Sequence, residues 1–226
     1  MALYHLPRRA QFSVGLFSDR RVHASNRDSV RADGGVCHGA AENLAQAWGG
    51  VTMVIKTAEE IENCKRAIFD NANETHERLK EKIRLLSATK FLEELKFDRL
   101  GADPMKGTEL NFIEQLNQMF SDLVVLEGAR RLLCLYPEKE LRLNLGPSSG
   151  FDIESIDGEI VAECFAVTTA TSNRKLEKDC SKLMSKAPAK QKYIYFYSRN
   201  DADEKLRRIY DKYPEITCIR ILGFEF

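Results

Sequence analysis

The spacing of apolar residues predicts an α/β domain in the second half of the chain. Residues 108–136 place apolar side chains at three- and four-residue intervals, which predicts an amphipathic helix that ends at Pro137. After Pro137, short apolar runs alternate with turn residues and with two segments of helical period. The pattern predicts strands over 141–146, 151–155, 159–168, 192–198 and 216–224, and helices over 172–184 and 201–213. The expected order over residues 107–226 is α-β-β-β-α-β-α-β, a mixed sheet flanked by helices.

Residues 53–106 have a helical period and predict a helical arm before this domain. Thr57 and Glu60 have the spacing of a capping box, and apolar residues recur at helical intervals up to Leu86. A second, short helix is expected over 90–97. Because such an arm is often an oligomerisation surface, a homo-oligomer formed through it is one expectation.

Residues 1–52 follow neither period and are rich in Gly, Ser, Asn and Asp, which predicts a poorly ordered extension. They contain six arginines and no lysine, whereas the rest of the chain has twelve arginines and sixteen lysines. Two interpretations stay open: a targeting peptide, and an upstream extension of the reading frame that makes Met53 the effective start. We expect a chain that begins at Met53 to fold.

Composition changes this picture only in what it excludes. Apolar residues make up 43% of the 226 residues, and Lys plus Arg equals Asp plus Glu at 34 each. Because the charges balance, a nucleic-acid partner would have to bind a local basic patch. No apolar run approaches the roughly 20 residues that span a bilayer, which predicts a cytoplasmic protein with no membrane partner.

Cysteine and histidine contribute little candidate chemistry. The six cysteines form no C-x-x-C pair, and several lie inside apolar runs, which predicts reduced thiols that pack as small apolar groups. The last of the four histidines is His76. A histidine nucleophile partner or zinc ligand in the α/β domain would therefore need a contribution from the N-terminal part.

Two acids occupy segments that otherwise predict buried strand, Asp152 in FDIES and Glu163 in EIVAECFAVT. An unpaired carboxylate in a core is costly, so each is expected to have a partner, a metal or a function. If the two strands are hairpin neighbours, side-chain alternation lets both acids converge on one face. Close carboxylates repel unless a cation or a proton lies between them, and a hard cation such as Mg²⁺ suits the pair. Glu127, on the preceding helix, could supply a third oxygen.

This order of elements, with an acid in the second strand and a Glu-x-x pattern in the third, resembles the PD-(D/E)XK nuclease superfamily. The resemblance covers roughly residues 108–226 and implies a restriction-endonuclease-like fold that hydrolyses phosphodiesters of DNA or RNA. Carried over position by position, it implies that Glu127, Asp152 and Glu163 are ligands for Mg²⁺ or Mn²⁺.

The lysine of the superfamily's third-strand Glu-x-Lys falls on Phe165, which can neither orient a water nor offset negative charge. Some members of such families recruit the lysine from another element, and Lys175 or Lys178 on the next helix is the available replacement. The resemblance then implies Asp152, Glu163 and Lys175 as catalytic residues, with Lys175 steadying the nucleophile or the transition state.

Structural explanations remain open for each of these features. Asp152 could bond backbone amides of the GPSSG turn, and Glu163 could form a structural ion pair. The alternating Tyr193, Tyr195 and Tyr197 either stack on bases or pack a helix against the sheet. A basic helix face either binds nucleic acid or is an ordinary solvated face: Arg174, Lys175, Lys178 and Lys182. Two functions therefore compete with an active nuclease: a catalytically inactive nuclease-like domain that binds nucleic acid or a protein partner, and an α/β interaction domain whose acids are structural.

Overall fold

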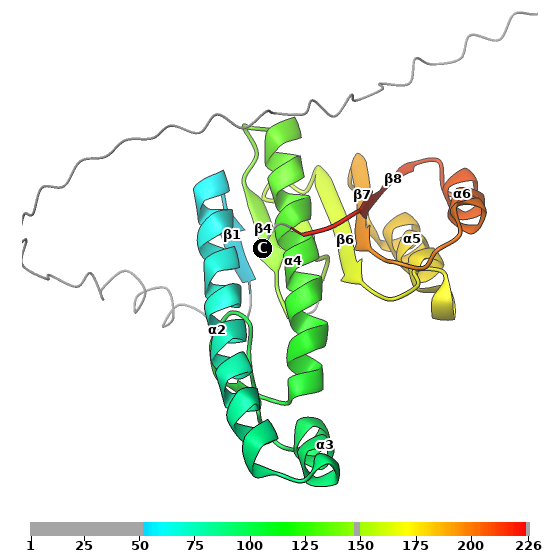
Figure 1. Ribbon diagram of the computed structural model, residues 1–226. Coiled ribbons are helices and arrows are strands. Elements are labelled where there is room, and N and C mark those ends of the chain that lie inside the picture. The colour runs from blue at the N-terminus through cyan, green and yellow to red at the C-terminus, as the bar shows by residue number, and fades with distance from the viewer. Residues whose placement is uncertain (1–51, 147–149, 225–226) are drawn as a thin grey trace, which may run out of the picture. The chain divides into compact units, whose positions relative to one another are not determined.

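The computed structural model describes residues 52–146 and 150–224. Apart from Thr52, the extension predicted over 1–52 lies outside the described residues, and so does the middle of the GPSSG turn, 147–149. The described residues confirm a mixed α/β class, since one six-stranded mixed sheet carries helices on both faces (Figure 1).

The six strands lie in the order β1-β4-β5-β6-β7-β8. Pairing is antiparallel from β1 to β6 and parallel from β6 to β8. The strands are β1 (Thr52–Ile55), β4 (Leu141–Asn144), β5 (Ile153–Ser155), β6 (Ile160–Ala166), β7 (Gln191–Tyr197) and β8 (Ile216–Ile221). The five strands predicted after Pro137 are all present, each starting and ending within one residue of its predicted range or inside it. Parallel neighbours need a crossover, which α5 (Lys175–Lys186) and α6 (Asp203–Lys212) supply.

Side-chain alternation along β6 and β7 divides the interior into two cores, one on each face of the sheet. Ala162, Cys164 and Tyr195 belong to the core under α2 (Ala58–Leu85) and α4 (Phe112–Leu135). Val161 and Phe165 belong to the core under α5 and α6. The central strands are therefore buried on both faces, which explains why β6 reads as an almost continuous apolar run.

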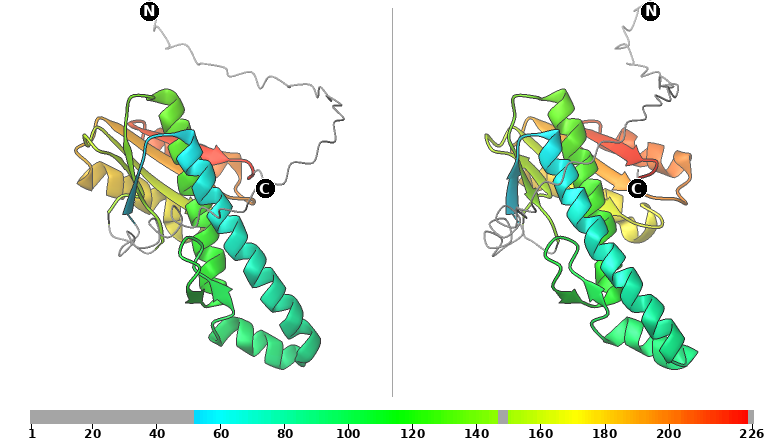
Figure 2. Two further views of the ribbon diagram at one scale, coloured as in Figure 1. Left: turned by 90° about the vertical axis from the view of Figure 1, so that its left-hand side faces the viewer. Right: turned by 60° about the vertical axis from the view of Figure 1, so that its left-hand side comes forward.

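Helix α4 is more deeply buried than a helix with one apolar stripe. Residues 122–129 are buried except Glu127, which is half-buried. One reason is that α2 packs along α4 while α4 also packs on the sheet, and the two helices run side by side in both views of Figure 2. Gly128 allows α4 to lie close to the sheet, because a Cβ atom there would lie 2.8 Å from Cδ2 of Tyr195 in β7.

The predicted arm over 53–106 is helical, but its first part also belongs to the core. β1 pairs with β4 at the edge of the sheet, and Ile55, Ile61 and Ile68 are fully buried. A four-residue strand, TMVI, directly before a helix gives too short a period to be recognised from sequence. Beyond α2 the arm contains α3 (Ala88–Phe97) and a small antiparallel sheet of β2 (Gly101–Ala102) and β3 (Glu109–Leu110).

Two expectations from composition can be compared with the described residues. None of the helices in this part of the chain is long and apolar enough to cross a membrane. The cysteines within 52–146 and 150–224 are free thiols, as predicted, and Cys64, Cys164 and Cys180 are buried.

The capping box that begins α2 is confirmed and gives a first testable prediction. Thr57 Oγ1 accepts a hydrogen bond from the Glu60 amide, and the Glu60 carboxylate accepts one from the Thr57 amide at 2.9 Å. Thr57→Ala is expected to lower the free energy of unfolding by about 1 kcal/mol. Chemical denaturation measures this change, and Thr57→Ser, which keeps the hydroxyl, should retain most of the stability. Equal losses in both variants would contradict the capping role.

Candidate functional site

The two acids singled out from the sequence lie opposite each other, Glu163 in β6 and Asp152 directly before β5. In the β5–β6 pair, Ile153 faces Ala162 and Glu154 faces Val161. Continuing this register by one residue brings Asp152 opposite Glu163. Oδ2 of Asp152 accepts a hydrogen bond from the Cys164 amide at 2.6 Å, which holds this carboxylate against β6.

A lysine from α5 reaches the acid pair. The Lys182 ammonium lies 2.6 Å from Oε1 of Glu163 and donates a hydrogen bond to the Gly150 carbonyl at 2.8 Å. It also lies 5.3 Å from the centre of the Phe151 ring. Lys182 is thus in direct contact with Glu163, whereas its sequence pattern indicates only a place on the basic helix face.

Lys175, the predicted catalytic lysine, has a different partner. Its ammonium is 3.0 Å from Oδ1 and 2.9 Å from Oδ2 of Asp179, and it lies 5.2 Å from the centre of the Phe165 ring. Asp179 is buried and brings a third acid close to the pair, since its charge contributes to the pKa values of both Asp152 and Glu163. The sequence feature that could have identified Asp179 and Lys182 as neighbours of Lys175 is their helical spacing from it, at i+4 and i+7.

Burial makes the charged forms of these acids unfavourable. Burial raises the pKa of Glu163 to about 7, and the nearby Asp152 adds to the rise while Lys182 opposes it. Burial likewise raises the pKa of Asp152 and of Asp179. Oε1 of Glu163 and Oδ2 of Asp179 are buried and accept no hydrogen bond among the described residues, although each has a lysine at ion-pair distance. Acids kept in this costly state are frequent at functional sites.

Glu127, the predicted third ligand, is engaged elsewhere. Its carboxylate accepts hydrogen bonds from Nε and Nη2 of Arg130 and from Nε of Arg131, each at 2.8 Å. Burial favours a raised pKa for Glu127, but the two arginines outweigh burial and lower that pKa. The structure therefore gives Glu127 its own ion-pair network.

Another acid of α4, Asp122, is electrostatically linked to the site. Asp122 is 3% exposed, and its Oδ1 accepts a hydrogen bond from the Gly146 amide at 2.9 Å. Burial raises the pKa of Asp122 to about 7, and the charges of Asp103 and Asp152 contribute to the rise. Sequence reasoning missed Asp122 because it lies within an apolar helical run with no visible partner nearby in the chain.

The alternating tyrosines of β7 pack a helix against the sheet and do not form an exposed platform. Tyr193 and Tyr195 are 6% and 0% exposed and belong to the core under α4. The hydroxyl groups of Tyr193 and Tyr136 lie 2.7 Å apart. Tyr197 is partly buried and contacts the ring of Phe224, with 4.8 Å between the ring centres.

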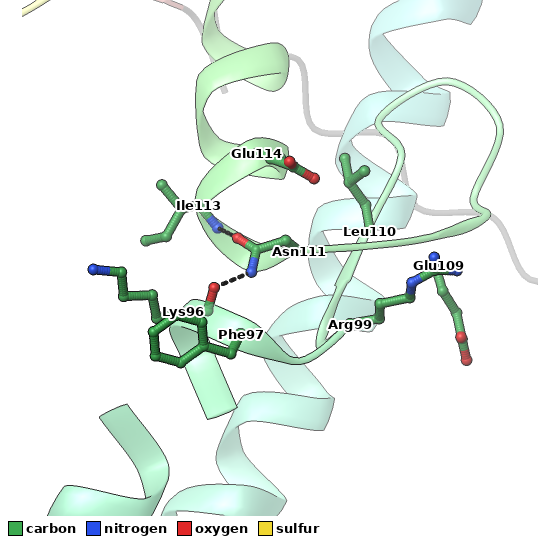
Figure 3. Close-up of a pocket in the computed structure, with 8 residues that line it drawn as sticks. All are labelled: Lys96, Phe97, Arg99, Glu109, Leu110, Asn111, Ile113 and Glu114. Atoms are coloured by element: carbon green, nitrogen blue, oxygen red, sulfur yellow. Dashed lines mark hydrogen bonds between the residues drawn. The ribbon is translucent and has the colours of Figure 1, made fainter. Parts of the chain in front are cut away.

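A separate hollow of about 560 Å³ lies at the end of the arm, where α3 meets the start of α4 (Figure 3). Asn111 joins the two elements, since it donates to the Lys96 carbonyl and accepts from the Ile113 amide. Phe97 and Ile113 line the hollow and are 71% and 48% exposed. The charged side chains that line this hollow are of both signs, Lys96, Arg99, Glu109 and Glu114. A homo-oligomer formed through the arm stays a prediction.

The acid pair suits a small divalent cation better than a metal cage built by the protein alone. No cluster of three or more His, Cys, Asp or Glu side chains is arranged to hold a metal within 52–146 and 150–224. Mg²⁺ usually needs only one or two carboxylates, because it keeps several waters and also binds substrate phosphates. Asp152 and Glu163 match this smaller ligand set, but Oε1 of Glu163 already lies 2.6 Å from the Lys182 ammonium, so a metal ion bound there would share or displace that lysine.

The site is defined by two strand acids and a lysine of the following helix, Asp152, Glu163 and Lys182. A second lysine and its acid, Lys175 and Asp179, lie beside them. Comparison of the chain with protein-family models, with curated proteins and with solved structures finds no match.

Proposed function

We propose that the protein is a metal-dependent phosphodiester hydrolase of the PD-(D/E)XK type that acts on nucleic acid. The observation that supports this most is the position of Lys182, a residue of α5 whose ammonium lies 2.6 Å from the Glu163 carboxylate. A lysine in contact with the second acid is the group that the third strand lacks at Phe165. The antiparallel β4–β5–β6 followed by the parallel β7 and β8 is compatible with a restriction-endonuclease-like fold.

In this proposal each residue has a distinct role. Asp152 and Glu163 hold Mg²⁺ or Mn²⁺, and the Cys164 amide orients the Asp152 carboxylate. When bound, the cation supplies charge that polarises a phosphoryl oxygen and lowers the pKa of a water. Lys182 stabilises negative charge that develops on the phosphoryl oxygens. Lys175 is a positioning residue that neutralises Asp179 beside the pair.

Isothermal titration calorimetry with Mg²⁺ and Mn²⁺ tests the ligand roles. Wild type is expected to bind, whereas Asp152→Asn and Glu163→Gln are expected to lose binding. Glu154→Gln is the matched control, because Glu154 is a β5 carboxylate paired with Arg142 at 3.4 Å. A folded wild-type protein that binds neither cation would refute the metal site.

Cleavage of single- and double-stranded DNA and RNA tests the role of Lys182. Lys182→Met is expected to lower kcat by about 10²-fold or more, by analogy with the loss of a charge-stabilising donor, while metal binding persists. Lys186→Met, at the end of the same helix, should leave kcat unchanged. Equal rates for Lys182→Met and wild type would contradict the proposal.

A catalytically inactive nuclease-like domain that binds nucleic acid or a protein partner is the second candidate. Phe165 at the lysine position favours it, and so does Lys182, which already compensates the charge of Glu163 without a metal. This candidate predicts no cleavage by wild type in Mg²⁺ or Mn²⁺. Cleavage that depends on Glu163 would exclude it.

A further inference from the structure

The connection from β6 to α5 forms a hollow of about 550 Å³ whose lining suits an anion. Apart from Val167, every lining residue carries a hydroxyl, an amide or an ammonium group, and none is acidic. The lining residues are Val167, Thr168, Thr169, Ser172, Asn173, Lys175 and Lys178. Lys175 is paired with Asp179, so Lys178 supplies the positive charge of this concave surface, and together with the hydroxyl and amide groups it is complementary to a phosphate group.

This connection is held in place by contacts behind the hollow. The two carboxylate oxygens of Asp201 accept hydrogen bonds from the amides of Ala170 and Thr171 at 2.7 and 3.0 Å. The Thr168 carbonyl accepts from the amides of Arg199 and Asn200 at 3.3 and 3.1 Å. Asp201 is thereby occupied by the backbone of the connection, so the hydroxyl and lysine groups are presented by a preformed loop.

The hollow lies on the same face of the sheet as the acid pair. Glu163, Phe165 and Val167 alternate onto one face, and the Val167 amide continues the β6–β7 pairing by donating to the Tyr197 carbonyl at 2.9 Å. At about 3.3 Å per residue, Val167 lies about 13 Å along the strand from Glu163. Lys175 connects the two places, since it lines the hollow and its ammonium contacts Asp179 beside the acids.

We propose that this hollow binds a backbone phosphate of a nucleic-acid strand whose reacting phosphodiester lies at Asp152 and Glu163. This inference rests on the proposed function for the place of the reacting group. A span of about 13 Å is longer than one nucleotide step, since each step of a duplex strand rises about 3.4 Å along the axis while it also turns around that axis. The substrate is therefore a polynucleotide of several residues, because a mononucleotide or a small phosphodiester cannot occupy both places at once.

Fluorescence anisotropy with a labelled twelve-residue oligonucleotide, single-stranded or in a duplex, tests the proposal on the full chain. Lys178→Gln is expected to weaken binding about three- to tenfold and to reduce the slope of log K against log salt by about 1. Ser172→Ala should weaken binding to a smaller extent. Lys186→Gln removes the same charge from the last turn of α5, outside the lining, and should leave the affinity unchanged.

The outcomes distinguish oligonucleotide binding in the hollow from nonspecific attraction to the lysines of α5. Equal losses in Lys178→Gln and Lys186→Gln, or no loss in either, would overturn the proposal. Inorganic phosphate that binds through Lys178 while oligonucleotide binding ignores Lys178 would also overturn it, in favour of a free-phosphate site. Binding that depends on Lys178 without cleavage in Mg²⁺ or Mn²⁺ would support the hollow and reject the hydrolase activity, so the two proposals fail separately.

Discussion

Replacing Glu163 with glutamine is expected to stabilise the protein by about 2 kcal/mol at pH 8, while it removes metal binding. The Glu163 side chain is 6% exposed, and burial with the nearby Asp152 raises its pKa from 4.5 to about 7. That rise corresponds to roughly 3 kcal/mol of stability lost when the group is charged. Part of the gain in the variant is offset, because Lys182 loses its charged partner.

The pH dependence gives this prediction its sign. Between pH 4.5 and about 7 the folded protein binds the Glu163 proton more strongly than the unfolded chain does. The wild-type contribution is therefore most favourable below pH 4.5 and is lost as the pH rises to about 7. Urea denaturation of both proteins at pH 5 and pH 8 should show a small difference at pH 5 and the full difference at pH 8.

The opposite result would identify Glu163 as a structural residue. If the Glu163–Lys182 pair holds the fold together, Glu163→Gln should be destabilising at both pH values. Glu154→Gln serves again as the matched control, because its exposed pair with Arg142 should change stability by less than about 1 kcal/mol. A stabilising substitution that abolishes binding is the pattern expected where function is maintained at a cost in stability.

Gly128→Val is expected to destabilise the protein by about 3 kcal/mol or more. A Cβ atom at Gly128 would lie 2.8 and 3.0 Å from ring atoms of Tyr195 and 3.2 Å from Cδ1 of Ile153. Both neighbours are fully buried, so neither can move without disturbing the packing of α4 on the sheet. Gly128→Ala should lose about 1 to 2 kcal/mol, because overpacking exceeds the roughly 1 kcal/mol gained in helix propensity.

Thermal unfolding measures this series, with about 10 °C expected for valine in a chain of this size. Gly223→Ala is the control, because a Cβ atom at Gly223 meets no atom within 4 Å. Unchanged stability in Gly128→Val would show that α4 lies farther from β7 than the structure places it. Loss in the control as well would indicate a general effect of glycine replacement.

Much of the α/β domain could be predicted because its signals are local. The period-two runs after Pro137 and the helical runs between them predicted five strands and two crossover helices within a few residues. β1 was missed because four residues show too little of a period, and its place at the sheet edge depends on pairing with β4. The depth of α4 was also missed, because it depends on α4 packing against α2 as well as against the sheet.

In the candidate site, too, local features could be predicted from the sequence and contacts between distant elements could not. The position of Asp152 and Glu163 in apolar runs indicated that two carboxylates would meet, and the β5–β6 register brings them opposite each other. The choice of lysine could not be read in this way, since Lys175, Lys178 and Lys182 share one helix face. The Lys175–Asp179 pair follows from i,i+4 spacing within α5, but only the rotation and position of α5 against the sheet decided that Lys182 contacts Glu163.

The sequence by itself determined the order of helices and strands after Pro137 and the placement of Glu163 in a buried strand and of Asp152 directly before the neighbouring strand, because these follow from residue type and local period. The tertiary structure decided which groups those acids meet, since contacts between elements depend on register, helix rotation and packing over long separations. Glu127 and Lys182 illustrate the difference: the ion pairs of Glu127 with Arg130 and Arg131 follow from helical spacing within α4, whereas the contact of Lys182 with Glu163 depends on where α5 lies against the sheet.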